Sequence, residues 1–159
     1  MLYFAYGSNM NLSQLRRRLK RDSIDPLFRA YLADTRLIFP RTSHGDWRGG
    51  VAGFEEAKGE RLWGAVFELH EREFLLLDEY EGYYGKGKEN DYERVEALAI
   101  KESGEKVKVT TYRANKVGEF DPSDYYLAAI VKGAELCGLP DEYIKWLKSI
   151  RTNGIKKPD

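Results

Sequence analysis

Close to its N-terminus the sequence reads Leu2-Tyr3-Phe4-Ala5-Tyr6-Gly7-Ser8-Asn9. An apolar strand here runs directly into a glycine-containing loop, and the loop leads into a helix. Gly7 permits a positive φ and leaves no Cβ between the backbone and a ligand. Ser8 and Asn9 can hold the turn through hydrogen bonds to nearby backbone groups. The loop is either a plain connection or a site whose N–H groups bind a carboxylate or a developing oxyanion.

Length and charge predict one domain over residues 1–159 that acts on a small molecule. The chain has 26 Lys and Arg residues and 26 Asp and Glu residues, so its formal net charge is zero. A neutral balance provides no field that would attract nucleic acid, a membrane surface or an acidic polymer. A neutral or zwitterionic ligand fits better, and the last residues, 151–159, are expected to form a loose tail.

The sequence favours a cytoplasmic protein without a metal or cofactor. We find no leader pattern at its start and no apolar run of membrane-spanning length. Cys137 is the one cysteine, and its place on an apolar helical face predicts a buried structural role. No spacing of Cys, His and acidic residues suggests a metal site. The oligomeric state is left open between a monomer and a homodimer.

The pattern of apolar residues and turn signals predicts an α+β fold with a mixed sheet that closes on itself. We expect a strand at the N-terminus and a turn-rich loop over 41–50. Asn11 with Gln14 resembles a capping box, and Asp121 is a candidate helix N-cap. Strands separated by single helices, without regular βαβ alternation, suggest a mixed sheet that closes on itself. The predicted strands are 28–39, 50–55, 61–69, 92–101 and 106–113, and the predicted helices are 11–21, 71–81, 122–137 and 141–151.

The second predicted helix carries acidic residues on the stripe that faces the core. Phe74, Leu77 and Glu81 follow helical spacing, and Asp78 lies on the same stripe. Burial and the negative end of the helix dipole both raise the pKa of a carboxyl group here. A glutamate whose pKa approaches neutrality is suited to general acid–base chemistry. The alternative is a helix end with ordinary surface acids.

Two further patterns have simple explanations. The basic run Arg16-Arg17-Arg18, with Lys20 and Arg21, is typical of a solvated helix face whose cations complement the helix dipole. A nucleophilic role for Ser8 is not favoured, because the sequence lacks a Gly-x-Ser-x-Gly elbow and only His44 and His70 could act as an imidazole base.

Two segments together resemble the γ-glutamylcyclotransferase family, which includes the AIG2-like proteins. They are the strand followed by Tyr6-Gly7-Ser8-Asn9 and the later segment Leu77-Asp78-Glu79-Tyr80-Glu81-Gly82. Trp47-Arg48-Gly49-Gly50 and Leu62-Trp63-Gly64 are similar to further family segments, and the stretch from Pro122 to Tyr126 resembles the longer members. Tyr92 with Arg94 is similar to the shorter AIG2-like members. The family fold is a small mixed β-barrel with helices around it.

The resemblance implies release of 5-oxoproline from a γ-glutamyl amide, by attack of the α-amine of the substrate on its own γ-carbonyl carbon. Glu81 matches the acid–base glutamate of the family, which leaves Asp78 a structural role. Backbone N–H groups of the loop from Tyr6 to Asn9 would bind the oxyanion and the glutamyl part. Tyr126 matches a tyrosine of the substrate pocket, and Tyr125 is the alternative if the helix is rotated. We expect only one of these two tyrosines to point into the pocket, because neighbouring helical residues diverge.

Three alternatives stay open on the sequence alone. The substrate is a γ-glutamyl amino acid or a γ-glutamylamine, or the chain is a non-catalytic module that binds a small metabolite in the same pocket. A buried carboxylate at Glu81 favours an enzyme, because a binding protein for the glutamyl group gains nothing from it. The loop over 83–91 is long, and whether it forms a lid over the leaving-group side is also open.

Overall fold

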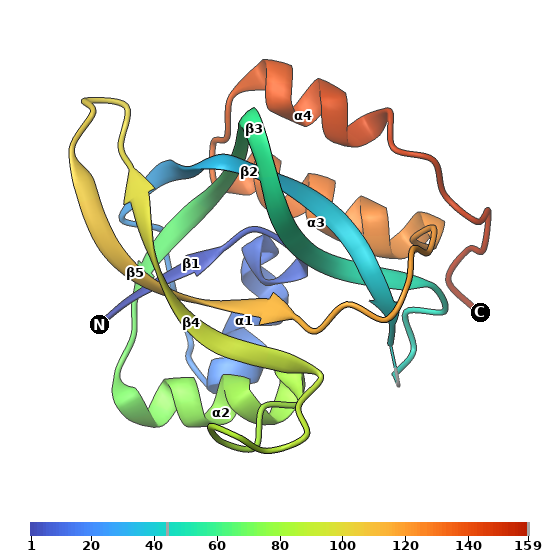
Figure 1. Cartoon of the computed structure of the whole chain (residues 1–159), viewed down its shortest axis with the longest axis horizontal. Helices are drawn as coiled ribbons and strands as arrows, with labels where there is room; N and C mark the ends of the chain where they lie inside the picture. The colour runs from blue at the N-terminus through green and yellow to red at the C-terminus, as the bar shows by residue number, and fades with distance from the viewer. Residues whose placement is uncertain (44, 159) are drawn as a thin grey trace.

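Five strands close into a barrel in the order β1-β3-β2-β4-β5 in the computed structural model, which describes residues 1–43 and 45–158 (Figure 1). The strands are β1 (Leu2–Ala5), β2 (Phe28–Thr42), β3 (Gly50–Glu68), β4 (Tyr92–Ile100) and β5 (Lys106–Ala114). β1 pairs antiparallel with β3 and parallel with β5, so the sheet is mixed. The predicted small closed mixed barrel is confirmed.

β2 and β3 form a long bent hairpin, and this corrects one expectation. We predicted separate strands over 50–55 and 61–69, but β3 is continuous. Between those two ranges Glu56 pairs with Thr35, and residues 57–60 lie at a register shift before Arg61 pairs with Ala33. A register shift between Ala33 and Thr35 bends the hairpin. Polar residues read as a loop in sequence, yet they suit a strand segment that is open to solvent.

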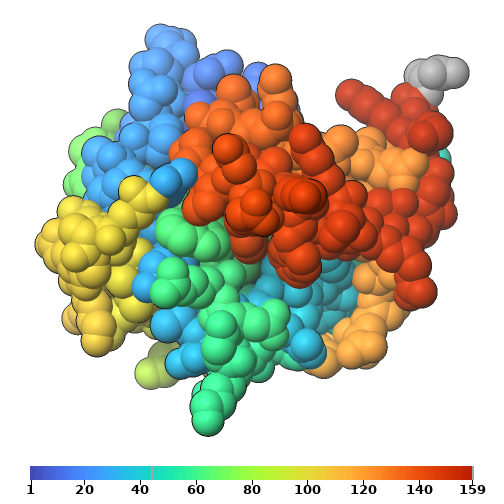
Figure 2. Space-filling model, turned by 90° about the horizontal axis from the view of Figure 1, so that it is seen from above, coloured from blue at the N-terminus to red at the C-terminus, as the bar shows by residue number. Residues whose placement is uncertain are grey.

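The helices lie around the barrel in two pairs. A short 3-10 helix η1 (Ser8–Met10) leads into α1 (Leu12–Leu19), which packs beside α2 (Glu71–Glu81). α3 (Asp124–Leu136) packs beside α4 (Asp141–Lys148). Figure 2 shows α3 in orange and α4 in red-orange over the upper face of the barrel. Both flanking pairs agree with the predicted α+β class.

The helix boundaries differ from the prediction at several ends. The N-cap of α3 is Ser123, whose side chain accepts a hydrogen bond from the N–H of Tyr126, and not Asp121. Asp121 pairs with Arg151 instead. α1 ends at Leu19 because Lys20 adopts the left-handed conformation that closes many helices. Caps depend on backbone angles, which a residue pattern alone does not determine.

The C-terminal residues, expected to be a loose tail, are hydrogen-bonded to the body of the molecule. The N–H of Asn153 donates to the carbonyl of Pro122 at 2.9 Å, and the N–H of Asp124 donates to the carbonyl of Ile155 at 2.9 Å. The side chain of Asn153 also donates to the carbonyl of Arg48 at 2.9 Å. The tail is therefore attached to the start of α3 and to the loop that follows β2, although most of its residues are exposed.

The core fills the barrel and the space beneath the helices. Phe4, Phe67, Phe74 and Leu77 are fully buried, so the apolar stripe of α2 packs as its helical spacing predicts. Cys137 is buried and free, which confirms its predicted structural role. No helix in the described part of the chain has the length and apolar character needed to cross a membrane.

Candidate active site

A cavity of about 850 Å³ lies where the end of β1, the end of α2 and the start of α3 meet. All six residues singled out by the resemblance line it, although they are up to 120 positions apart in sequence. They are Tyr6, Gly7, Ser8, Asn9, Glu81 and Tyr126. The tertiary fold thus brings the predicted glycine loop, the predicted acid and the predicted tyrosine to one site.

Gly7 follows β1 with φ −115° and ψ −141°, so the positive φ that a glycine permits does not occur here. The glycine is explained by a close approach. A Cβ at this position would lie 3.1 Å from the Cβ of Ala52 and 3.9 Å from the hydroxyl of Tyr126. The loop backbone therefore packs directly against β3, and a side chain would intrude between the loop and the cavity.

The N–H groups of Gly7, Ser8 and Asn9 are free to bind a ligand. Among the hydrogen bonds of the described chain, none has these N–H groups as donor, whereas the carbonyl groups of Gly7 and Ser8 accept bonds from Met10 and Asn11. The first N–H groups of a helix have no partner within that helix, and η1 begins at Ser8. The loop therefore offers unpaired donors at the cavity wall, an arrangement that suits an oxyanion or a carboxylate.

The side chain of Asn9 links the loop to both neighbouring helices. Its Oδ1 accepts from Nε2 of Gln14 at 3.2 Å and from Nη1 of Arg18 at 3.0 Å. Gln14 also donates to Oγ of Ser8 at 2.9 Å. Asn11 does cap α1 by accepting from the N–H of Gln14, but the side chain of Gln14 holds the loop and does not complete a capping box.

The basic face of α1 is not simply solvated, which corrects a second expectation. Arg17 and Arg18 line the cavity. Arg21 forms an ion pair with the buried carboxylate of Glu73 at the start of α2. Sequence reasoning missed Arg18, and its spacing of four residues from Gln14 on the same helix face is the signal that could have indicated it.

Glu81 is the last residue of α2, and its carboxyl group faces Asn9 across the cavity. Nδ2 of Asn9 donates to Oε1 of Glu81 at 3.2 Å. Burial raises the pKa of Glu81 to about 7, the nearby charge of Arg18 and the Asn9 hydrogen bond oppose this rise, and Asp78 adds to it. Gly82 follows with φ 66°, so the helix closes directly after the acid. The direction of this shift is the one that the sequence predicts for a buried carboxyl group at a helix C-terminus.

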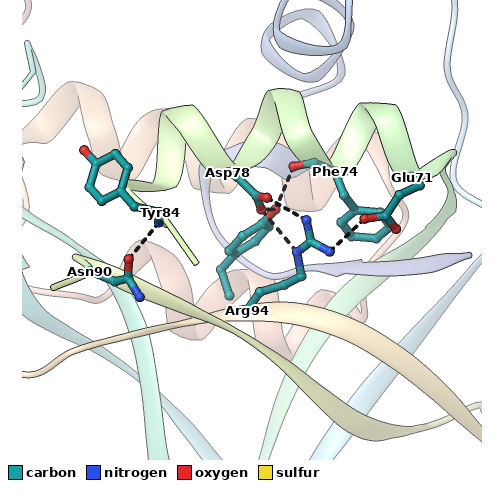
Figure 3. Close-up of polar contacts among 7 residues, drawn as sticks. Glu71, Phe74, Asp78, Tyr84, Asn90 and Arg94 are labelled. Atoms are coloured by element: carbon teal, nitrogen blue, oxygen red, sulfur yellow. Dashed lines mark hydrogen bonds and ion pairs between the residues drawn. The ribbon is translucent and has the colours of Figure 1, made fainter. Parts of the chain in front are cut away.

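Asp78 is structural within the fold, as Figure 3 shows. Its Oδ2 forms an ion pair with Nη2 of Arg94 at 2.6 Å, and its Oδ1 accepts from the hydroxyl of Tyr112 at 2.6 Å. Glu71 contacts the same guanidinium at 3.1 Å from the exposed side. Asp78 therefore ties α2 to β4 and β5, and it does not line the cavity that Glu81 lines.

Both Tyr125 and Tyr126 line the cavity, so the expectation that only one of them points into it is wrong. The hydroxyl of Tyr126 accepts from the N–H of Ala52 at 2.8 Å, and Tyr92 donates to the carbonyl of Ala52 at 2.5 Å. The hydroxyl of Tyr125 is buried and has no hydrogen-bond partner among the described residues. The rings of both tyrosines contact the ring of Trp47.

The remaining candidates lie outside the site. His70 is the N-cap of α2, and His44 falls outside the described residues, so Ser8 has no imidazole base in the described site. The described residues contain no group of His, Cys, Asp and Glu suited to hold a metal.

From the loop over 83–91 only Asp91 lines the cavity, and Asn90 holds the loop by accepting from the N–H of Tyr84 at 2.7 Å (Figure 3).

Comparison with known proteins identifies the family. The sequence profile of the AIG2-like family matches residues 61–147. The γ-glutamylcyclotransferase of Bos taurus is 33% identical over 159 residues, covering 98% of this chain and 81% of the bovine protein. The human γ-glutamylcyclotransferase is 32% identical, covering 96% of this chain and 79% of the human protein. A solved structure of a γ-glutamyl cyclotransferase matches with a TM-score of 0.85 at 31% identity, over 98% of this chain and 90% of that one.

The match over residues 61–147 places the chain among the AIG2-like proteins. The chain belongs to the γ-glutamylcyclotransferase family, and it is an enzyme of the cyclotransferase type. This agrees with the resemblance seen in the sequence.

Proposed function

We propose that this enzyme releases 5-oxoproline from γ-glutamyl amino acids, with Glu81 as general acid and base. The observation that carries the proposal is the pairing of Glu81, whose pKa is about 7, with a loop of unpaired N–H donors in the same cavity. A group with this pKa can both accept and return a proton near neutral pH. A module that only binds a metabolite would gain nothing from a carboxyl group kept in such surroundings.

The chemistry needs one proton carrier and one oxyanion site. The α-amine of the substrate attacks its own γ-carbonyl carbon, while Glu81 takes a proton from the attacking nitrogen. The N–H groups of Gly7, Ser8 and Asn9 stabilise the negative charge on the carbonyl oxygen. The bond to the leaving nitrogen then breaks, and Glu81 returns the proton to that nitrogen. Because both reacting groups belong to one bound molecule, proximity supplies much of the rate.

Tyr6 and Tyr126 line the same cavity and support this arrangement. The hydroxyl of Tyr6 donates to the carbonyl of Tyr112 at 2.6 Å, so its ring forms a fixed wall of the cavity. The hydroxyl of Tyr126 accepts from Ala52, which leaves its proton available for a hydrogen bond to the substrate. Burial raises the pKa of both hydroxyl groups above their usual range, so both stay protonated donors.

The charges at the cavity favour a leaving group that carries a carboxylate. Five cationic and three acidic side chains line it, and Asp91 is paired with Arg41. Besides Arg18 and Arg41, the cations are Arg17 on α1, Lys132 on α3 and Lys157 in the tail. A γ-glutamyl amino acid presents a carboxylate to these cations, whereas a γ-glutamylamine derived from a polyamine presents a cation. We therefore favour the amino acid as the leaving group.

A substrate panel tests the proposal. The purified protein is incubated with a γ-glutamyl amino acid, with the same compound carrying a carboxamide in place of the leaving-group carboxylate, and with a γ-glutamylamine. Mass spectrometry measures 5-oxoproline and the released amine. We expect the highest kcat/KM for the free carboxylate. Preference for the γ-glutamylamine would overturn the substrate assignment, and no 5-oxoproline from any compound would overturn the activity.

A further inference from the structure

Arg18 reaches the catalytic acid through another side chain. Its Nη1 donates to Oδ1 of Asn9 at 3.0 Å, and its guanidinium lies over the ring of Tyr80, with the central carbon 4.7 Å from the ring centroid. Tyr80 precedes Glu81 on α2, so one guanidinium contacts both the loop and the helix that carries the acid. Planar stacking and a directed hydrogen bond together hold an arginine in one orientation.

Both Oδ1 and Nδ2 of the Asn9 side chain make two hydrogen bonds. Oδ1 accepts from Arg18 and Gln14, while Nδ2 donates to the hydroxyl of Tyr3 at 2.9 Å and to Glu81 at 3.2 Å. Oδ1 can only accept and Nδ2 can only donate. Two donors at Oδ1 therefore determine that Nδ2, and not Oδ1, faces the carboxyl group of Glu81.

We propose that Arg18 is a positioning residue, which fixes the Asn9 amide with Nδ2 toward Glu81 and keeps the Glu81 carboxylate ready to accept the substrate proton. The inference rests on the proposed role of Glu81. Without Arg18, only Gln14 would orient the Asn9 amide, and an amide turned by 180° would place Oδ1 against the carboxylate. That arrangement favours the protonated acid, which cannot act as a base.

Electrostatics support the same role. Arg18 is the one cation among the charged groups that influence the pKa of Glu81 in the described chain, and it favours the ionised carboxyl group. Asp78 opposes it from the same helix, and burial opposes it most strongly. The other titratable groups that face Glu81 are hydroxyl groups that stay protonated. They are Tyr3 on β1, Tyr6 at its end, Tyr92 on β4, Tyr112 on β5 and Tyr126 on α3.

A direct titration tests the inference without needing turnover. The ¹³Cδ resonance of Glu81 is followed against pH by NMR in the native protein, in Arg18→Met and in Arg16→Met, and is assigned by its absence in Glu81→Gln. Arg16 is the matched control, because it lies on the same helix but does not line the cavity. We expect the midpoint to move to higher pH in Arg18→Met and to stay in place in Arg16→Met. An unmoved midpoint in Arg18→Met overturns the inference.

Kinetics then separate charge from orientation. In Arg18→Met, we expect kcat/KM to fall roughly tenfold at pH 6, the loss expected for a hydrogen bond to a charged group, and to fall less at pH 9. Arg18→Lys keeps the charge but loses the directed hydrogen bond and the stacking, so its titration midpoint should move less than in Arg18→Met while kcat still falls. This variant also serves if Arg18→Met does not fold. Full activity in Arg18→Lys would overturn the positioning role.

A double-mutant cycle with Asn9→Ala completes the test. If Arg18 acts through Asn9, the orientation part of its effect on kcat disappears in the Asn9→Ala background. Full additivity of the two changes in kcat would show that Arg18 does not act through Asn9. A shifted titration in a protein that releases no 5-oxoproline would keep the inference and overturn the proposed function, so the two failures are distinct.

Discussion

Asp78 and Glu81 lie one turn apart on α2, but their carboxyl groups have opposite surroundings. Asp78 is in an ion pair with Arg94 at 2.6 Å and accepts from Tyr112, whereas Glu81 receives only a neutral hydrogen bond, from Asn9 at 3.2 Å, among the described residues. A carboxylate with a buried cationic partner stays ionised and stabilises the fold. A carboxyl group without one can exchange its proton near neutral pH. The first two predictions separate these roles.

Glu81→Gln should lower kcat by roughly 10²–10⁴-fold while the protein stays folded, because the amide keeps the shape but cannot transfer a proton. Substrate binding should largely survive. Turnover with a γ-glutamyl amino acid and binding by calorimetry measure the two effects. Near-native turnover in Glu81→Gln, together with an inactive but folded Asp78→Asn, would show that the roles are reversed.

Asp78→Asn should destabilise the fold by about 1–3 kcal/mol, because the partly buried Arg94 loses its buried carboxylate partner. The matched control is Glu71→Gln, which removes the exposed partner of the same guanidinium and should cost less than about 1 kcal/mol. Urea unfolding of both variants gives the comparison. Equal effects of the two substitutions would contradict the assignment.

The stability of the native protein should fall as pH rises through the pKa of Glu81. This pKa is about 7 in the folded state and near 4.5 for an exposed glutamate, so the folded state binds more protons between those values. Glu81→Gln removes this titration. The free energy of unfolding of the variant minus that of the native protein should therefore be larger at pH 8 than at pH 5, by up to about 3 kcal/mol. Thermal unfolding at both pH values measures this, and a pH-independent difference would contradict it.

Gly7→Ala should raise KM and lower kcat together, by roughly tenfold in kcat/KM, because its Cβ would lie 3.1 Å from Ala52 and next to the free N–H donors. The φ of Gly7 is negative, but its ψ of −141° lies outside the usual β and α regions, so alanine should also cost some thermal stability, and the kinetics are compared at a temperature where the variant is folded. Gly118→Ala is the matched control, since its Cβ would also meet a neighbour at 3.1 Å, but away from the cavity. Unchanged kinetics would show that the loop only connects strand and helix.

Tyr126→Phe should reduce kcat/KM by the equivalent of about 1.5–3 kcal/mol, and should also reduce stability, because the N–H of Ala52 loses its acceptor. Tyr125→Phe removes a hydroxyl group that has no partner among the described residues, so stability should not fall and catalytic efficiency should change little. Kinetics and thermal unfolding of both variants decide. A complex with 5-oxoproline that shows the hydroxyl of Tyr125 on the ligand would reverse the assignment.

Several features followed from local pattern alone. The strand-to-loop transition at Gly7 and the acidic end of the helix before Gly82 depend on residue spacing over a single turn or strand. Alternation, helical spacing and stop signals act over a few residues, so they determine these elements wherever they lie in the fold. The position of Glu81 on an apolar stripe was likewise enough to predict its raised pKa, because burial of that stripe follows from its composition.

Other features depended on contacts between distant segments. The backbone of Gly7 packs closely against Ala52, and β3 is continuous because pairing with β2 resumes at Arg61, beyond the register shift that follows Glu56. Arg18 belongs to the site only because α1 packs beside α2, which places its guanidinium between Asn9 and Tyr80. Charge and hydrogen bonding act through space, so the sequence by itself determined the elements and the acid, and the tertiary structure alone decided which side chains surround that acid.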